Sequence, residues 1–133
     1  MKVFVTGGSG FIGIPLVRHL LEKGHQVKML DLKEPAIKHK NLEFVNKSVM
    51  DELAEDIKGC DLVLHLAAIL GVINSDNKPL ETMRINLEGS VNVFKSAIEA
   101  DVKHMVYASS SEVYGEPREL PIREESVKGP VST

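Results

Sequence analysis

The sequence predicts an α/β fold of the Rossmann type, a doubly wound parallel sheet with the strand order 3-2-1-4-5. Short apolar runs alternate with helical patterns between residues 2 and 108, and this alternation is typical of a parallel sheet with helices on its faces. A glycine-rich segment, TGGSGFIG, separates the first strand from the first helix, as it does in this fold. Right-handed crossovers then favour the doubly wound order.

The composition supports one globular domain covering residues 1–133. Apolar residues make up 43% of the chain and charged residues 26%, which is typical of a folded domain. The net charge of −3 argues against nucleic acid or an anionic membrane as a partner. Cys60 is the single cysteine and the five histidines are widely spaced. We therefore predict no disulfide, no metal site and a reducing, cytoplasmic location.

The first half of the chain predicts three strands and one clear helix. The helix covers residues 11–23 and ends at Gly24, and Pro15 should bend it because proline removes a backbone donor. The expected apolar stripe of this helix consists of Ile12, Leu16 and Leu20. The expected strands are KVFV (2–5), QVKML (26–30) and LEFV (42–45).

The second half continues the alternation. Asp51 is expected to cap a short helix that runs to Lys58. A loop over 69–78 precedes a long helix that runs from Pro79 to Ala100. From Glu116 onward the chain reads as loop. The expected strands are LVLHL (62–66) and HMVYA (104–108), and the expected stripe of the long helix is Leu80, Met83, Leu87, Val91, Phe94 and Ile98.

The segment TGGSGFIG (6–13) has the glycine spacing of a dinucleotide-binding turn. Gly7 can form the tight turn, Gly10 lets a pyrophosphate approach the backbone, and Gly13 lets the helix pack on the strand. The N–H groups at the helix start then face the phosphate charge. No Gly-Lys-Ser/Thr follows, which excludes a nucleotide triphosphatase loop. The predicted cofactor contacts here are Gly7, Gly10, Phe11, Ile12 and Gly13.

Asp31 ends the second predicted strand, where a carboxylate accepts hydrogen bonds from the adenine-ribose hydroxyls and repels a 2′-phosphate. We therefore predict that NAD is bound in preference to NADP, with Leu32 as a neighbouring contact. Lys33 is near enough in sequence to weaken the preference for NAD. The alternative is that the glycines are only turn residues and Asp31 only caps a loop.

Together with these motifs, further segments resemble the extended short-chain dehydrogenase/reductase family of NAD-dependent sugar-nucleotide epimerases and dehydratases. The matching segments run in family order and span nearly the whole chain. They are TGGSGFIG (6–13), LD (30–31), HLAA (65–68), NLEGSVNVFKSA (86–97) and SSSEVYGEP (109–117).

The resemblance implies roles for residues along the cofactor. Leu66, Ala67 and Ala68 would leave room for the nicotinamide half at the end of strand four. His65 is interpreted as a core histidine whose hydrogen-bonding groups have partners within the protein. Asn86 either supports the active-site region or is a solvated helix residue. Ser48 stands where the family often has an aspartate that holds the adenine amino group, so Ser48 and Val49 are predicted as adenine contacts, with Ser109 as a further cofactor contact.

The SSSEVYG segment carries the expected chemistry. Its register against VYG places Ser110 on the family's catalytic hydroxyl, which hydrogen-bonds the sugar oxygen being oxidised. Glu112 is where related dehydratases and decarboxylases carry an acid that can remove a proton beside the C4 ketone. Ser111 stands at the position where many 4,6-dehydratases have a second acidic residue. The alternative for Glu112 is a solvated or helix-capping residue.

The family's general base is a tyrosine followed four residues later by lysine, and neither Tyr107 nor Tyr114 has that partner. We therefore expect the chain to be the amino-terminal part of a longer, homodimeric enzyme that acts on a nucleotide sugar, with a UDP-sugar as the predicted substrate. Such an enzyme, similar to UDP-glucose 4-epimerases, works by transient oxidation at sugar C4. The chain alone is predicted inactive. The alternatives are a non-catalytic dinucleotide-binding module and a decarboxylase or 4,6-dehydratase that uses Glu112.

Overall fold

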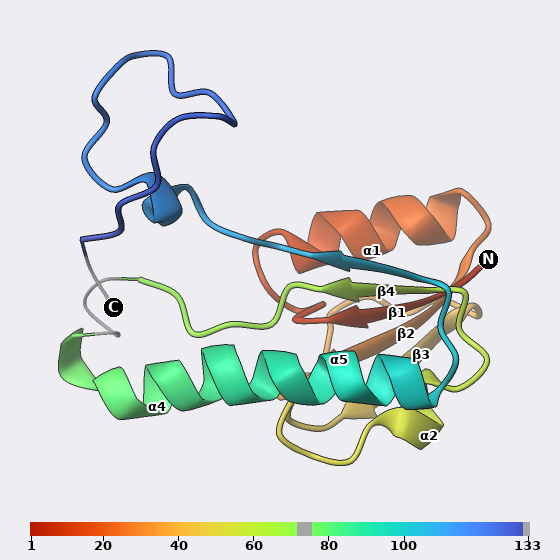
Figure 1. Ribbon diagram of the computed structural model, residues 1–133. Coiled ribbons are helices and arrows are strands. Elements are labelled where there is room, and N and C mark those ends of the chain that lie inside the picture. Colours follow the sequence, from red (N-terminus) through yellow and green to blue (C-terminus); the bar gives the residue numbers. More distant parts are fainter. Residues whose placement is uncertain (72–75, 132–133) are drawn as a thin grey trace.

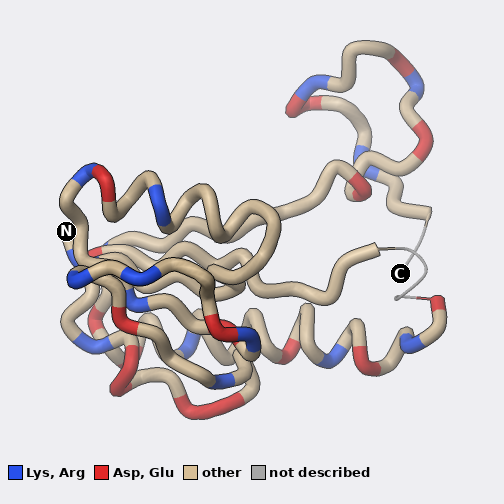
Figure 2. The backbone as a smooth tube through the Cα atoms, turned by 180° about the vertical axis from the view of Figure 1, so that it is seen from behind, with Lys and Arg blue, Asp and Glu red and all other residues tan. Residues whose placement is uncertain are grey.

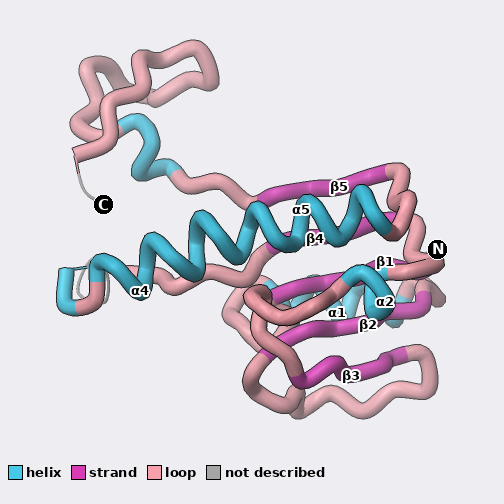
Figure 3. The backbone as a smooth tube through the Cα atoms, turned by 60° about the horizontal axis from the view of Figure 1, so that its bottom comes forward, coloured by secondary structure: helices cyan, strands magenta, loops and turns pink. Residues whose placement is uncertain are grey.

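The structure is a computed structural model that describes residues 1–71 and 76–131, and it contains a parallel sheet with helices on both faces (Figure 1). The strand order is β3-β2-β1-β4-β5 (Figure 3), and each neighbouring pair is parallel, which confirms the predicted fold class. The strands are β1 (Lys2–Thr6), β2 (Gln26–Asp31), β3 (Leu42–Asn46), β4 (Leu62–His65) and β5 (His104–Tyr107).

The helices form two layers around this sheet. Helix α1 covers one face, and α2 and α5 cover the other (Figure 1). In β1 the side chains of Val3 and Val5 join the cluster under α1, whereas Phe4 joins the cluster under α2 and α5. A strand buried on both faces needs such a continuous apolar run. The helical segments are α1 (Gly13–Glu22), α2 (Ala54–Ile57), α4 (Pro79–Met83), the π-helical turn η1 (Arg84–Glu88), α5 (Gly89–Glu99) and the 3₁₀ turn η2 (Ser111–Tyr114).

Helix α1 begins two residues later than predicted, because the glycine-rich turn continues through Ile12. Its fully buried face is displaced by one position from the stripe predicted from Ile12, Leu16 and Leu20, of which Leu20 packs at the edge of the core. Pro15 is the third helical residue, where a backbone N–H has no intrahelical partner. Proline therefore costs the helix no hydrogen bond at this position, and the reason given for a bend at Pro15 does not apply. The buried residues of α1 are Gly13, Val17 and Leu21.

The long helix begins at Pro79 as predicted, but the η1 turn divides it. Of its predicted stripe, Phe94 packs on the protein, against His65 and Tyr107, whereas most of the other residues are exposed. Leu80 is 83% exposed and Ile98 is 77% exposed. Small residues lie against the sheet layer instead, because they permit close approach: a Cβ atom on Gly89 would lie 2.6 Å from Cγ2 of Val49. The buried residues of α4 and α5 are Thr82, Gly89, Ser90, Val93, Ser96 and Ala97.

The prediction that Asp51 caps a helix was wrong. Helix α2 starts at Ala54 with Leu53 at its N-cap, while the Asp51 carboxylate accepts a hydrogen bond from Ser48 N at 2.7 Å. Asp51 therefore closes the turn after β3 instead. Of the loop predicted at 69–78, residues 72–75 lie outside the described residues.

Residues 116–131 have no helix or strand, as predicted. Figure 2 shows positive and negative residues interspersed along the backbone. Within the part of the chain that the structure describes, none of the helices combines the length and apolar character needed to cross a membrane.

Candidate functional site

The carboxyl ends of the central strands meet at one edge of the sheet. Thr6 pairs with Leu30 on one side and with His65 on the other, and His65 pairs with Tyr107. The segments that follow these strands therefore emerge side by side. In open parallel sheets this edge, near the central strands where the chain order reverses, is the usual ligand-binding position.

The glycine-rich turn packs closely on the segment after β4. Gly7 has φ of +72°, and a Cβ atom there would lie 2.7 Å from Ala67 N, so any other residue would be strained and would clash with backbone. A Cβ atom on Gly13 would collide with the carbonyl oxygen of Gly7. These contacts explain why two of the three predicted glycines occupy their positions.

The same turn leaves backbone donors open for a ligand. A Cβ atom on Gly10 would meet only the Gly7 carbonyl oxygen, at 3.2 Å. The Phe11 side chain is 97% exposed and that of Ile12 is 63% exposed. Among the described residues, the N–H groups of Phe11 and Ile12 have no backbone acceptor. The start of α1 therefore offers the free N–H groups and the positive helix end that bind phosphate in other proteins.

Asp31 is held at the mouth of this turn by two backbone donors. Its carboxylate accepts hydrogen bonds from Ser9 N at 2.9 Å and from Lys33 N at 3.0 Å. The Ser9 hydroxyl also donates to the Lys33 carbonyl oxygen at 2.6 Å. Because a carboxylate has about four acceptor positions, Asp31 keeps acceptor capacity for a ligand. Leu32 beside it is exposed.

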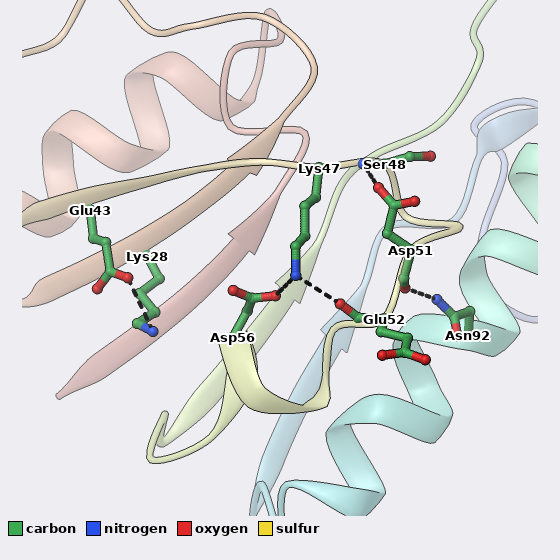
Figure 4. A network of polar contacts seen from close by, with 8 residues as sticks. All are labelled: Lys28, Glu43, Lys47, Ser48, Asp51, Glu52, Asp56 and Asn92. Atoms are coloured by element: carbon green, nitrogen blue, oxygen red, sulfur yellow. Dashed lines mark hydrogen bonds and ion pairs between the residues drawn. The ribbon is translucent and has the colours of Figure 1, made fainter.

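The segment after β3 is fixed from two sides (Figure 4). Lys47 Nζ lies 2.6 Å from the carboxylate of Asp56 in α2, and this hydrogen bond raises the pKa of Lys47. Asn92 Nδ2 in α5 donates to the Val49 carbonyl oxygen at 2.7 Å. Ser48 is thereby held beside the end of β3, but the side chain of Val49 is buried in the core. Only the main chain of Val49 can meet a ligand.

A cavity of about 410 Å³ opens at the carboxyl ends of β4 and β5. It brings together many of the predicted site residues, namely Leu66, Ala67, Ala68, Asn86, Ser109, Ser110 and Glu112. Ser111 is not in its lining, and neither are the glycine-rich turn, Asp31, Leu32, Ser48 and Val49. The predicted residues thus fall into two groups: one at the cavity, and one at the glycine-rich turn and the ends of β2 and β3.

Two polar side chains reach this cavity from the segment after β5. Ser110 is the N-cap of η2, and its hydroxyl oxygen accepts a hydrogen bond from Glu112 N at 3.2 Å. The hydroxyl proton of Ser110 remains available to a ligand. Glu112 lies in the first turn of η2 with an exposed side chain. Ser110, and not Glu112, is the residue that caps this turn.

Asn86 is not a solvated helix residue. Its Oδ1 atom accepts from Ile69 N at 2.8 Å, and its Nδ2 atom donates to the Ile69 carbonyl oxygen at 3.0 Å. These two bonds hold the segment that lines the cavity. The sequence analysis assigned no role to the two side chains that complete this support, although both lie in the quoted segments. They are Thr6 and Ser90.

The glycine-rich strand–helix turn, the acid at the end of β2 and the cavity at the carboxyl edge define a dinucleotide-binding α/β protein of the Rossmann class. The profile of the NAD dependent epimerase/dehydratase family matches residues 3–133, and the chain belongs to this family. Membership confirms the resemblance found in the sequence. It also confirms the predicted cofactor, because the family is NAD-dependent.

Individual relatives act on nucleotide sugars according to their names. The chain is 33% identical to a UDP-glucose 4-epimerase of Lactobacillus helveticus over 99% of its own length and 42% of that protein. It is 35% identical to a UDP-N-acetyl-alpha-D-glucosaminuronate decarboxylase of Bacillus cytotoxicus, over 86% of the chain and 38% of that protein. The chain therefore spans less than half the length of these relatives.

Among solved structures, the chain resembles a UDP-glucose 4-epimerase from Stenotrophomonas maltophila with bound NAD and formylated UDP-arabinopyranose. The TM-score is 0.90 and the sequences are 28% identical, over 99% of this chain and 44% of that one. The described fold is therefore close to one half of a nucleotide-sugar enzyme.

Proposed function

We propose that this chain is the NAD-binding domain of a nucleotide-sugar epimerase or dehydratase that oxidises the sugar transiently at C4. The observation that carries the proposal is the convergence of Ala67, Asn86, Ser110 and Glu112 on one cavity beside the glycine-rich turn. A UDP-sugar is the proposed substrate, because the similar proteins named above act on or bind UDP-sugars. Cytoplasmic location, inferred from the single cysteine, is part of the same proposal.

The residues at the glycine-rich turn fit the adenosine diphosphate half of NAD. The open N–H groups of Phe11 and Ile12 would bind the pyrophosphate, and Asp31 would accept hydrogen bonds from the ribose hydroxyls. The Ser48 hydroxyl oxygen can accept a hydrogen bond from the adenine amino group, less strongly than a carboxylate would. The absence of a side chain at Gly10 leaves the turn accessible to a ligand.

The cavity fits the reacting half. The small side chains of Ala67 and Ala68 would leave space for the nicotinamide end of NAD, which would supply the hydride acceptor for the sugar. The free hydroxyl proton of Ser110 would hydrogen-bond the sugar oxygen that becomes a carbonyl. Asn86 fixes the cavity wall through Ile69. These residues bind and orient the reactants, and orientation alone contributes strongly to rate.

A decarboxylase or dehydratase is the second candidate, because Glu112 carries a carboxylate in the cavity lining. Once C4 is a ketone, that carboxylate could accept a proton from the neighbouring carbon or assist loss of a carboxyl group. Glu112→Gln in the longer protein separates the candidates: epimerisation would persist, whereas dehydration or decarboxylation would fall.

Asp31→Ala should weaken NAD binding by about 1–3 kcal/mol, because a hydrogen-bonded carboxylate is lost. Wild type should prefer NAD to NADP, and Asp31→Asn should narrow that preference because the charge is removed while an acceptor remains. Calorimetric titration measures both effects. Asp61→Ala is the matched control, since Asp61 accepts from Lys2 N at 2.6 Å at the opposite edge of the sheet. Equal affinity of wild type for NAD and NADP would contradict this assignment.

We also propose that a second copy of the protein covers the exposed apolar stripe of α4, η1 and α5, which consists of Leu80, Met83, Leu87, Val91 and Ile98. Ion pairs of mixed sign lie on these segments, Lys78 with Glu81 and Arg84 with Glu88, so an antiparallel copy can oppose opposite charges. Leu87→Asp should convert the dimer to monomer in sedimentation experiments, whereas Leu120→Asp, at an exposed leucine in the 116–131 loop, should not. A monomeric wild type at tens of micromolar contradicts the proposal.

A further inference from the structure

A buried chain of hydrogen bonds crosses from β1 to α5 in the wall of the cavity, and its first member is Thr6. The Thr6 hydroxyl oxygen accepts from Ala67 N at 3.2 Å, and at 3.3 Å it shares the Leu66 N–H with the Thr6 main-chain carbonyl oxygen, which lies 3.1 Å from Leu66 N. A hydroxyl oxygen has two acceptor positions and one proton. Because both acceptor positions are used, the proton points to the remaining neighbour, Nδ1 of His65, at 2.6 Å.

The direction of that bond fixes the tautomer of His65. Nδ1 accepts, so a neutral ring carries its proton on Nε2. Nε2 lies 3.0 Å from the Ser90 hydroxyl oxygen and donates to it. The Ser90 hydroxyl in turn donates to the Asn86 carbonyl oxygen at 2.6 Å. Thr6, His65 and Ser90 are all buried, so none of these bonds is exchanged readily for a bond to water.

The chain of bonds joins the two ends of one cavity wall. Thr6 holds this wall at Leu66 and Ala67, and Asn86 holds it at Ile69 through both atoms of its amide. His65 and Ser90 connect these two attachment points. The His65 ring is further fixed between Tyr107, with ring centroids 5.6 Å apart, and Phe94, with centroids 6.1 Å apart.

We propose that His65 is a positioning residue whose neutral Nε2–H tautomer couples Thr6 to Ser90 and thereby sets the shape of the cavity wall formed by residues 66–69. The consequence for the nicotinamide end of NAD rests on the proposed function. The tautomer and the coupling between the two attachment points do not depend on it.

Protonation of His65 breaks this arrangement. A proton on Nδ1 would point at the Thr6 oxygen, whose acceptor positions are already filled, and the Thr6 proton would lose its acceptor. The groups that meet the ring are Thr6 from β1, Tyr107 from β5, and Ser90 and Phe94 from α5. Tyr107 is the ionisable group among them. Glu112 from η2 is the charged residue in the cavity lining.

The sign of the resulting pH dependence follows from burial, which lowers the pKa of His65 below its usual 6.5. The unfolded chain takes up this proton at higher pH than the folded chain does. The stability contributed by neutral His65 is therefore fully present above pH about 6.5. It is lost as the pH falls from there through the folded-state pKa.

Nitrogen-detected NMR of the imidazole in the 133-residue chain tests the tautomer directly in wild type. At neutral pH we expect a protonated Nε2 and a bare Nδ1. A protonated Nδ1 would overturn the proposal, because the Thr6 proton would then have another acceptor. This measurement needs no variant.

Amide hydrogen exchange tests the coupling. Thr6→Val should accelerate exchange at Ile69, which Thr6 does not touch, by roughly tenfold, within the range of couplings measured for linked groups. Thr6→Ser keeps the hydroxyl and should restore protection. Corrected for intrinsic exchange, protection at Ile69 should fall with the titration of His65, and Glu112→Gln should leave that profile unchanged.

Unchanged exchange at Ile69 in a folded Thr6→Val protein would overturn the coupling. If Thr6→Val does not fold, the pH profile of exchange at Ile69 in wild type tests the coupling instead. Protection of Ile69 that does not depend on the protonation of His65 would also overturn the coupling. A wild-type chain that shows the predicted tautomer and coupling but does not bind NAD would refute only the proposed function.

Discussion

In the proposed longer enzyme, Ser110→Ala should lower kcat by about 10²-fold or more, which is the scale for loss of one positioned transition-state donor. Ser110 lies in the cavity lining, and its oxygen is fixed by Glu112 N at 3.2 Å. Its free proton would stabilise the sugar oxygen as charge develops there. KM should change less than kcat, because the interaction strengthens in the transition state.

Ser111→Ala is the matched control for this variant. Ser111 is the adjacent hydroxyl, outside the cavity lining, and its loss should leave kcat within a few-fold of wild type. If Ser111→Ala is the damaging change, the register of the SSSEVYG segment is wrong by one residue. Steady-state kinetics of both variants with the same nucleotide sugar make the comparison direct.

Residues 1–133 alone should show no epimerase or dehydratase turnover, even when cofactor is bound. Neither tyrosine has a lysine four residues later, since Ser111 follows Tyr107 and Arg118 follows Tyr114 at that spacing. General-base assistance is worth about 10²–10⁴-fold, and it would be missing. We also expect residues 1–133 to hold too little of the sugar-binding surface to position a substrate.

The exposure of β5 at one edge of the sheet is consistent with the proposal that the chain is part of a larger enzyme. Strand β5 has one neighbouring strand among the described residues, and Val106 and Tyr107 on it are 57% and 52% exposed. An apolar strand edge of this kind is usually covered. We propose that further chain of the longer protein covers it.

The assay for this second prediction is incubation of the chain with NAD and a panel of UDP-, GDP- and dTDP-sugars. No NADH absorbance and no altered sugar should appear. Clear turnover would refute the inactive-domain proposal and would require another proton acceptor, with Glu112→Gln as the first variant to measure.

The sequence was sufficient to predict the strand order and the glycine-rich turn because both depend on local patterns. Continuous apolar runs such as Val3–Val5 identify strands buried on both faces. Gly7 and Gly13 occupy positions where a side chain would clash with backbone. Asp31 ends its strand beside this turn, as predicted. These features need no knowledge of distant contacts.

The helix faces were predicted only in part, because packing overrode hydrophobicity. On α5 the small residues Gly89, Ser90 and Ala97 lie against the protein, whereas large apolar residues such as Leu87 on η1 and Ile98 on α5 face outward. A stripe of large apolar residues normally predicts the buried face. In this chain the stripe lies on an exposed surface, which is the surface that we propose a second copy of the protein covers.

The support of the cavity wall could not be predicted either, because its members are far apart in sequence. Thr6 and His65 are separated by 59 positions, and His65 and Ser90 by 25. Each residue alone is an ordinary polar side chain. Only the parallel register that pairs Thr6 with His65 brings them together.

An NAD titration followed by amide NMR of the described chain tests the central claim most directly. The account predicts saturable shifts at Phe11, Ile12 and Asp31 together with shifts at Ala67 and Ala68, because one dinucleotide would extend from the glycine-rich turn to the cavity. Absence of saturable shifts, or shifts confined to the 116–131 loop, would contradict the proposal that this domain binds NAD across the carboxyl edge of its sheet.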